Sequence, residues 1–103
     1  MEYIVSHRAN YEPDGHHDYP DKRYDTLEEA QAYYNEQRDK CRKEADKHIE
    51  EYPALYAQDY MREDLFHDDP EDILEKEEYF GDIAGFTFHE NYTYHIWTLS
   101  YEA

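Results

Sequence analysis

Carboxylates crowd residues 65–83, whose sequence is LFHDDPEDILEKEEYFGDI. Eight of these nineteen residues are Asp or Glu, and Lys76 is the one basic residue among them. The wider range 59–82 contains eleven acids and two bases. Charges of one sign at this density repel each other and destabilise a fold. Because such an array is suited to binding a basic surface, it is the first candidate for a functional site.

Metal binding is the second chemistry that the sequence raises, since Asp14-Gly15-His16-His17-Asp18 combines imidazoles and carboxylates, which Zn²⁺ accepts. Adjacent His side chains rarely both point at one ion, and no second paired spacing such as Cys-x2-Cys accompanies them. The acidic run lacks the alternating Asp pattern of an EF-hand. We therefore expect exposed loop histidines, with no metal and no cofactor.

The sequence contains no clear catalytic motif. Ser6 and Ser100 do not lie in a nucleophile-elbow context, and the three glycines are too dispersed to form a phosphate-binding loop. Cys41 is the single cysteine, and a small buried helix residue explains it better than a nucleophile does. We therefore do not expect an enzyme.

The charge balance narrows the class of partner. The 103 residues contain 27 acids and 10 bases, giving a formal net charge of −17. This field repels nucleic acid and anionic membranes and attracts basic proteins. Thirteen tyrosines indicate a folded chain with an aromatic core. With no signal-peptide pattern and no apolar span, we expect one domain, residues 1–103, in a reducing cytoplasm.

Periodicity and turn residues predict the elements that would hold these side chains. Residues 2–8 alternate like a strand, and 10–24 read as a loop with Pro13, Asp14-Gly15 and Pro20 as turn signals. Thr26 and Glu29 form a capping box before a long helix that ends at Tyr52, ahead of Pro53. A second helix is predicted over 53–66, and its apolar, core-facing positions would be Leu55, Tyr56, Tyr60, Met61 and Leu65.

A third helix is predicted from Asp69-Pro70 to Gly81, since Asp is a good N-cap and Pro suits the first turn. Residues 86–101 change to period two and predict a hairpin with its turn at 89–91. The expected fold class is α+β: a three-stranded antiparallel sheet (N-terminal strand plus C-terminal hairpin) packed against two or three helices, in the order β-α-α-α-β-β.

The candidate partner-binding residues are the acids of 59–82 and one tyrosine among them: Asp59, Glu63, Asp64, Asp68, Asp69, Glu71, Asp72, Glu75, Glu77, Glu78, Tyr79 and Asp82. Asp69, Glu71 and Asp72 have a local role at the predicted helix N-terminus. The acids from Glu75 onward lie at the negative end of the helix dipole, where they do not help the helix. We therefore expect a partner to bind Glu75, Glu77, Glu78 and Asp82.

Small size, a net charge of −17, one Cys and many aromatics make the chain resemble the phage- and plasmid-encoded DNA-mimic inhibitors, including anti-restriction and anti-CRISPR proteins. The resemblance rests on composition alone. It implies an acidic inhibitor in the cytoplasm of a bacterial host cell that occupies the basic nucleic-acid-binding cleft of a host defence enzyme or nuclease. The alternative is an acidic adaptor or accessory domain that binds a basic partner without mimicry.

Overall fold

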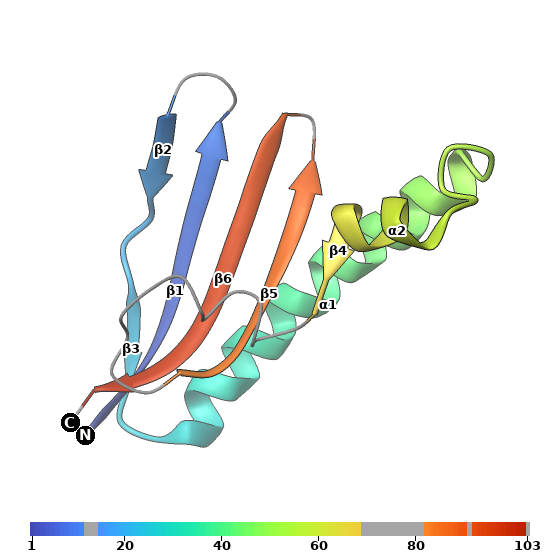
Figure 1. The fold of residues 1–103 in the computed structure, drawn as a ribbon. Helices are drawn as coiled ribbons and strands as arrows, with labels where there is room; N and C mark the ends of the chain where they lie inside the picture. The colour runs from blue at the N-terminus through green and yellow to red at the C-terminus, as the bar shows by residue number, and fades with distance from the viewer. Residues whose placement is uncertain (12–14, 69–81, 91, 103) are drawn as a thin grey trace.

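The computed structural model of the chain describes residues 1–11, 15–68, 82–90 and 92–102. A curved antiparallel sheet and one long helix dominate the architecture (Figure 1). In chain order the elements are β1 (Glu2–Tyr11), β2 (Gly15–Asp18), β3 (Lys22–Tyr24), α1 (Leu27–Glu51), α2 (Asp59–Leu65), β4 (Phe66–His67), β5 (Asp82–Glu90) and β6 (Thr93–Glu102).

The first and last strands form the centre of the sheet. The strand order is β2-β1-β6-β5-β4, and β3 also pairs with β1. The β1–β6 ladder runs without a break from Glu2 opposite Glu102 to Tyr11 opposite Thr93. Since β5 and β6 are consecutive and antiparallel, they form a hairpin at the C-terminal end, as predicted. Its predicted bounds are wrong, because β5 begins at Asp82 and continues through His89 and Glu90, which were assigned to the turn.

Local capping residues and a proline set the two ends of α1. The Thr26 hydroxyl oxygen accepts a hydrogen bond from the Glu29 backbone N–H at 3.3 Å, which confirms Thr26 as the N-cap. The helix ends at Glu51, with Tyr52 as its C-cap immediately before Pro53. The 25-residue helix therefore matches its predicted bounds closely.

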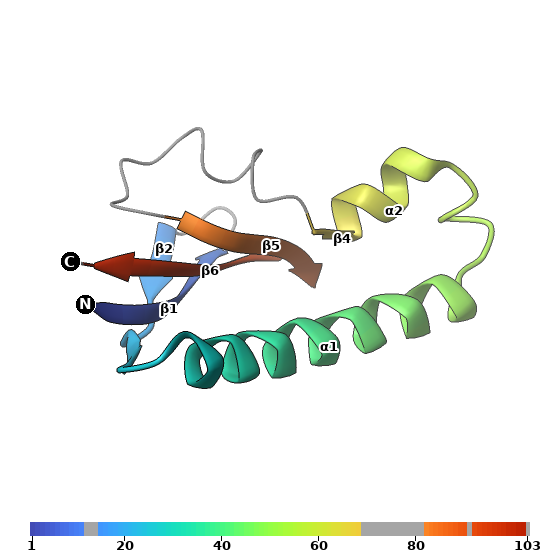
Figure 2. The same cartoon turned by 90° about the horizontal axis from the view of Figure 1, so that it is seen from below.

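The core lies between α1 and one face of the sheet (Figure 2). Directly paired residues in an antiparallel ladder point to the same face, so Val5 and Leu99 share this face with Phe86 and Trp97. Tyr34 of α1 is buried against them, with its ring edge-on to Phe86 at 5.6 Å between centroids. The aromatic core expected from the composition is thus present.

The predicted sheet and element order are wrong. The sheet has six strands, and the described residues contain two helices. The predicted loop 10–24 contributes β2 and β3, because β1 continues to Tyr11 and both short strands pair with it. Backbone pairing with β1 stabilises these short strands, and local propensity does not show it.

The second predicted helix is also wrong in extent. Helical structure covers Asp59–Leu65 rather than 53–66, and Phe66–His67 pairs with β5 as an edge strand. Leu55 and Tyr60, which the helix pattern assigns to the core, are exposed. The helix predicted from Asp69-Pro70 to Gly81 lies outside the described residues. Neither described helix is long and apolar enough to cross a lipid bilayer.

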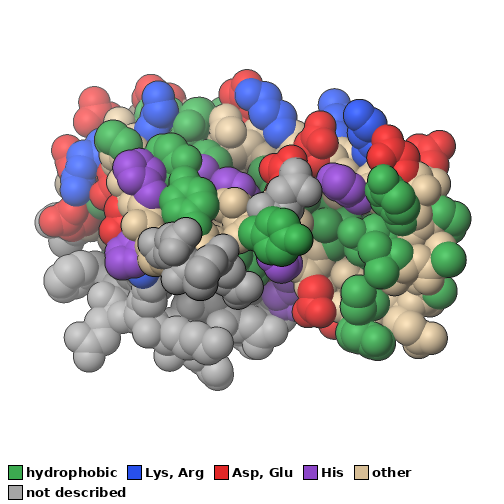
Figure 3. Space-filling model, turned by 90° about the horizontal axis from the view of Figure 1, so that it is seen from above, with side chains coloured by type: hydrophobic (Ala, Val, Ile, Leu, Met, Phe, Trp, Pro, Cys, Tyr) green, Lys and Arg blue, Asp and Glu red, His purple; other side chains and the backbone are tan. Residues whose placement is uncertain are grey.

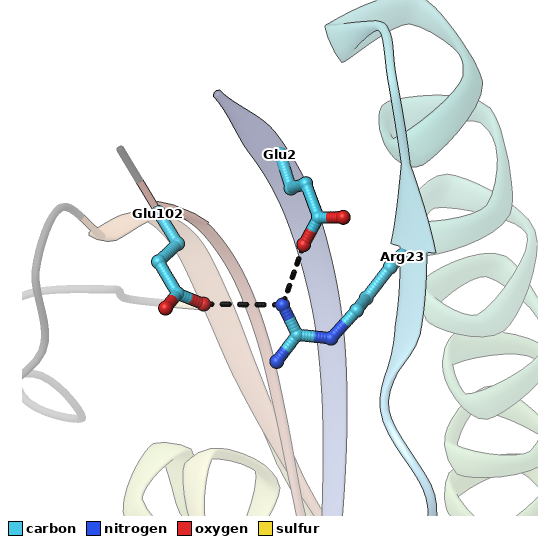
Figure 4. Close-up of polar contacts among 3 residues, drawn as sticks. All are labelled: Glu2, Arg23 and Glu102. Atoms are coloured by element: carbon cyan, nitrogen blue, oxygen red, sulfur yellow. Dashed lines mark hydrogen bonds and ion pairs between the residues drawn. The ribbon is translucent and has the colours of Figure 1, made fainter.

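A shared cation holds three strand ends together (Figure 4). Glu2 and Glu102 face each other across the β1–β6 ladder, where like charges are destabilising. Arg23 of β3 donates through Nη1 to Glu2 at 2.7 Å and to Glu102 at 3.1 Å. The guanidinium therefore offsets the repulsion that the strand register creates.

Candidate functional site

Four of the predicted partner-binding acids lie in the described part of the chain with their side chains. Asp59, Glu63 and Asp64 are exposed on α2. None of these three forms an ion pair within the described residues. Asp68 differs, because its carboxylate lies 3.8 Å from the Arg38 guanidinium of α1. The three α2 acids thus form an unpaired acidic surface.

The other eight predicted partner-binding residues lie in residues 69–82. Seven lie outside the described residues: Asp69, Glu71, Asp72, Glu75, Glu77, Glu78 and Tyr79. Asp82 opens β5, where its backbone is opposite Ser100. Their role therefore stays a prediction from the sequence.

The solvent face of α1 has mixed charge. Lys, Arg, Asp and Glu side chains are interspersed along the α1 side of the molecule (Figure 3). Lys40 lies 3.4 Å from Glu36 one turn earlier, and Arg38 lies 3.9 Å from Asp39. Half of the ten basic residues belong to this helix: Arg38, Lys40, Arg42, Lys43 and Lys47. This surface is less suited to a basic partner than α2 is.

An apolar patch adjoins the α2 acids. Tyr52, Leu55 and Tyr60 are 55%, 54% and 62% exposed, and hydrophobic side chains gather on the α2 side of the molecule (Figure 3). Sequence reasoning missed this patch because it read Leu55 and Tyr60 as the buried stripe of a longer helix. Exposed large apolar groups that lie together mark interaction surfaces.

A cavity of about 430 Å³ lies between α1 and the α2–β4 segment. Its lining includes two arginines and two aspartates: Arg42, Arg62, Asp46 and Asp68. The Arg42 guanidinium lies 5.5 Å from the centroid of the Phe66 ring, within cation–π range. Since opposite charges are balanced in the lining, the cavity does not select an anion or a cation.

His7 lies between two aromatic rings on the core-facing side of β1. Its ring stacks on Trp97 at 3.9 Å and on Tyr19 at 4.4 Å between centroids. Its Nε2 is 2.9 Å from Nδ1 of His95. Burial, with smaller contributions from His95 and His17, lowers the pKa of His7 to about 4. The pair is therefore neutral at physiological pH, one imidazole donating to the other.

Cys41 lies half-buried on α1 and packs against the core. Burial, reinforced by the charges of Glu90 and Glu44, raises the pKa of its thiol to about 11. The thiol is protonated at neutral pH, which disfavours nucleophilic chemistry because the thiolate is the reactive form.

Residues 15–18 of the Asp14–Asp18 motif form β2 rather than a loop. Successive strand side chains point to opposite faces, so His16 and His17 diverge. Asp18 accepts a hydrogen bond from Arg8 at 2.6 Å, and this bond lowers the pKa of the Asp18 carboxyl. The adjacent imidazoles therefore do not converge on one point.

Another group of ligand-type side chains does converge. Glu44 and His48 of α1 meet Glu90 at the end of β5, with one donor atom from each within 4.8 Å of the others. Glu90 is 42 residues beyond His48 in the chain, so spacing alone could not reveal this group. The only local signal was the Glu44–His48 pair at i, i+4 on the predicted helix.

No family model, curated protein or solved structure matches the chain. Its function is therefore inferred from its own charge, surface and geometry.

Proposed function

We propose that the protein is an acidic inhibitor that mimics nucleic acid and occupies the basic nucleic-acid-binding cleft of a host defence enzyme or nuclease, of the anti-restriction or anti-CRISPR type. The observation that carries the proposal is charge density. A net charge of −17 is distributed over a body 46 Å long, or about 2.7 Å per charge (46 Å divided by 17). Duplex DNA carries about one charge per 1.7 Å.

The surface that supports the proposal best is α2. Asp59, Glu63 and Asp64 are exposed and have no ion-pair partner within the described residues, so their charge is available to another protein. Eight further acids follow in residues 68–82 of the sequence. A cleft lined with Lys and Arg would gain from releasing the counterions that both surfaces hold.

An acidic adaptor is the second candidate, and the patch of Tyr52, Leu55 and Tyr60 favours it. Exposed aromatic and aliphatic side chains beside charged ones resemble the centre and rim of an ordinary protein interface. An adaptor would bind a basic partner mainly through this apolar area and need not compete with nucleic acid.

Salt and competition distinguish the two candidates. The tagged protein is used at low salt to capture nucleases and other nucleic-acid enzymes from a bacterial lysate, and each captured enzyme is purified. For a mimic, affinity falls by orders of magnitude between about 50 and 200 mM salt, and duplex DNA or guide RNA displaces the protein. Nucleic acid does not displace an adaptor.

Matched charge variants locate the surface. Asp59→Asn, Glu63→Gln and Asp64→Asn together remove three charges from α2. Asp21→Asn, Asp25→Asn and Glu28→Gln remove three exposed charges near the start of α1. The proposal expects the α2 variant to lose affinity and to have a weaker salt dependence, and the control variant to change little.

A larger change tests the acids of the sequence-predicted site. Reversing Glu71, Asp72, Glu75 and Glu78 to Lys should abolish inhibition of the target enzyme, with circular dichroism verifying that the fold is kept. Retained inhibition by this folded variant would contradict nucleic-acid mimicry.

A further inference from the structure

Three metal-ligand side chains from two distant segments meet beside the C-terminal half of α1. Glu44 and His48 are one helical turn apart and so lie on the same face of α1. Glu90 ends β5 at the tip of the β5–β6 hairpin. One donor atom from each residue lies within 4.8 Å of the other two. The fold of helix on sheet, rather than a local loop, brings them together.

The two carboxylates of this group have no Lys or Arg partner within the described residues. Within the described residues, neither Glu44 nor Glu90 forms an ion pair with Lys or Arg, although five basic residues lie on α1. Two carboxylates that approach each other repel, and a bound cation would remove that cost. Glu90 and His48 are also partly buried, so their side chains have less freedom to avoid the contact.

The donor set indicates which ion fits. Two carboxylate oxygens and one imidazole nitrogen suit a first-row transition ion such as Zn²⁺, whereas Ca²⁺ and Mg²⁺ prefer all-oxygen sites. Zn²⁺ binds these donors at about 2.0–2.2 Å, which places tetrahedral ligand atoms about 3.4 Å apart. The donor atoms, which lie within 4.8 Å of one another, would have to move closer to reach that spacing.

We propose that Glu44, His48 and Glu90 bind one divalent transition-metal ion, with Zn²⁺ as the best fit, and that the ion links α1 to the end of β5. Three protein ligands leave a fourth position for water, as in open zinc sites. The proposal does not depend on the inhibitor function. It also places the metal away from the His16-His17 motif that the sequence first suggested.

The test is Zn²⁺ binding by isothermal titration calorimetry to the full chain after treatment with EDTA. Wild-type protein should bind one equivalent, and Co²⁺ in its place should give the visible absorption of a bound ion. His48→Gln and Glu90→Gln should each weaken Zn²⁺ binding by more than about tenfold, since even the groups that only support a ligand have effects of that size. Glu44→Gln provides a third variant if either fails to fold.

The controls separate this site from surface histidines. His89→Gln alters an exposed imidazole adjacent to Glu90, on the opposite face of β5. Glu50→Gln removes an exposed carboxylate of α1 outside the cluster, and a double His16→Gln, His17→Gln variant removes the β2 motif. All three controls should bind Zn²⁺ like the wild type.

Stability provides a second readout. Zn²⁺ should raise the unfolding midpoint of the wild type and of the controls, but not that of folded His48→Gln or Glu90→Gln, because a ligand stabilises only the state that binds it. The proposal is overturned if the wild type binds no Zn²⁺, if His48→Gln and Glu90→Gln bind it normally, if the β2 double variant removes binding, or if Ca²⁺ or Mg²⁺ binds more tightly.

Discussion

At the scale of single residues, His7 shows how the sheet fixes a protonation state. Its ring is covered on both sides by Tyr19 and Trp97, and one of its nitrogens faces a nitrogen of His95. A hydrogen bond between two imidazoles needs one donor and one acceptor. Protonating both rings would set two N–H groups and two positive charges against each other. The folded state therefore favours neutral His7.

This preference makes stability depend on pH. The unfolded pKa of His is about 6.5 and that of folded His7 is about 4. The unfolded chain binds more protons between these values, so the contribution of His7 is complete above pH 6.5 and is lost as the pH falls toward 4. We predict a loss of about 1–2 kcal/mol across this range, allowing for solvent screening of a half-buried ring.

The measurement is urea denaturation of wild-type protein and His7→Gln at pH 7.5 and pH 5.2. Acidification also relieves repulsion among the carboxylates, which stabilises both proteins alike, so the difference between them isolates His7. That difference should shrink at pH 5.2. An NMR titration that places the His7 pKa at 6 or above would contradict the prediction.

At the scale of elements, the interface between α1 and the sheet contains the buried core. Tyr34 is 2% exposed and packs on Phe86. Its hydroxyl is buried without a hydrogen-bond partner among the described residues, and burial raises the pKa of that hydroxyl. An unsatisfied buried polar group destabilises the fold by about 1–3 kcal/mol. The ring stabilises the interface while its hydroxyl weakens it.

We predict that Tyr34→Phe raises the free energy of unfolding by about 1 kcal/mol, since it removes the unpaired hydroxyl and keeps the ring. Tyr34→Ala should lower it by about 3–5 kcal/mol through the cavity it leaves. Urea denaturation measures both. If Tyr34→Phe were destabilising instead, the hydroxyl would have a polar partner that stabilises the folded state.

The elements also show which parts of the fold could be predicted. α1 was predictable because Thr26 and Pro53 act locally, and the C-terminal hairpin because its side chains alternate. The short strands β2, β3 and β4 could not be predicted, because strands of two to four residues exist only through pairing with β1 or β5. The helix containing α2 was predicted too long because pairs such as Tyr56 and Tyr60 have helical spacing, although Leu55 and Tyr60 are exposed.

The candidate sites also differ in whether the sequence could predict them. The exposure of the α2 acids could be expected because charged side chains rarely leave water, whereas their role in partner binding stays a prediction. The group formed by Glu44, His48 and Glu90 was not, because only the docking of α1 on the sheet brings Glu90 to the helix. Sites that depend on contacts between distant segments leave little trace in residue spacing.

At the scale of the whole molecule, repulsion between like charges destabilises the compact fold. The net charge of −17 is held in a body of 46 × 29 × 21 Å. Ion pairs such as Arg23 with Glu2 and Glu102 reduce the repulsion locally. Most acids have no base to pair with, because the chain has 27 acids and 10 bases. Self-repulsion of this kind destabilises the compact state and is screened by salt.

We therefore predict that NaCl stabilises the free protein. Raising ionic strength from about 10 mM to about 150 mM shortens the screening length from about 30 to 8 Å, and the unfolding midpoint should rise. A gain of about 1 kcal/mol corresponds to roughly 4–8 °C in a domain of this size. Thermal unfolding followed by circular dichroism measures it. A midpoint that falls with NaCl would show that attractive ion pairs outweigh the repulsion.

The pairing of β1 with β6 sets the order in which the chain can fold. The centre of the sheet joins Glu2 to Glu102, so its longest ladder closes a loop of nearly the whole chain. During synthesis β1 must wait for β6 to leave the ribosome, while α1 can form early from its own capping signals. Folds dominated by such distant contacts form in milliseconds to seconds. A nascent chain of this protein would therefore expose the apolar face of β1 until β6 has left the ribosome.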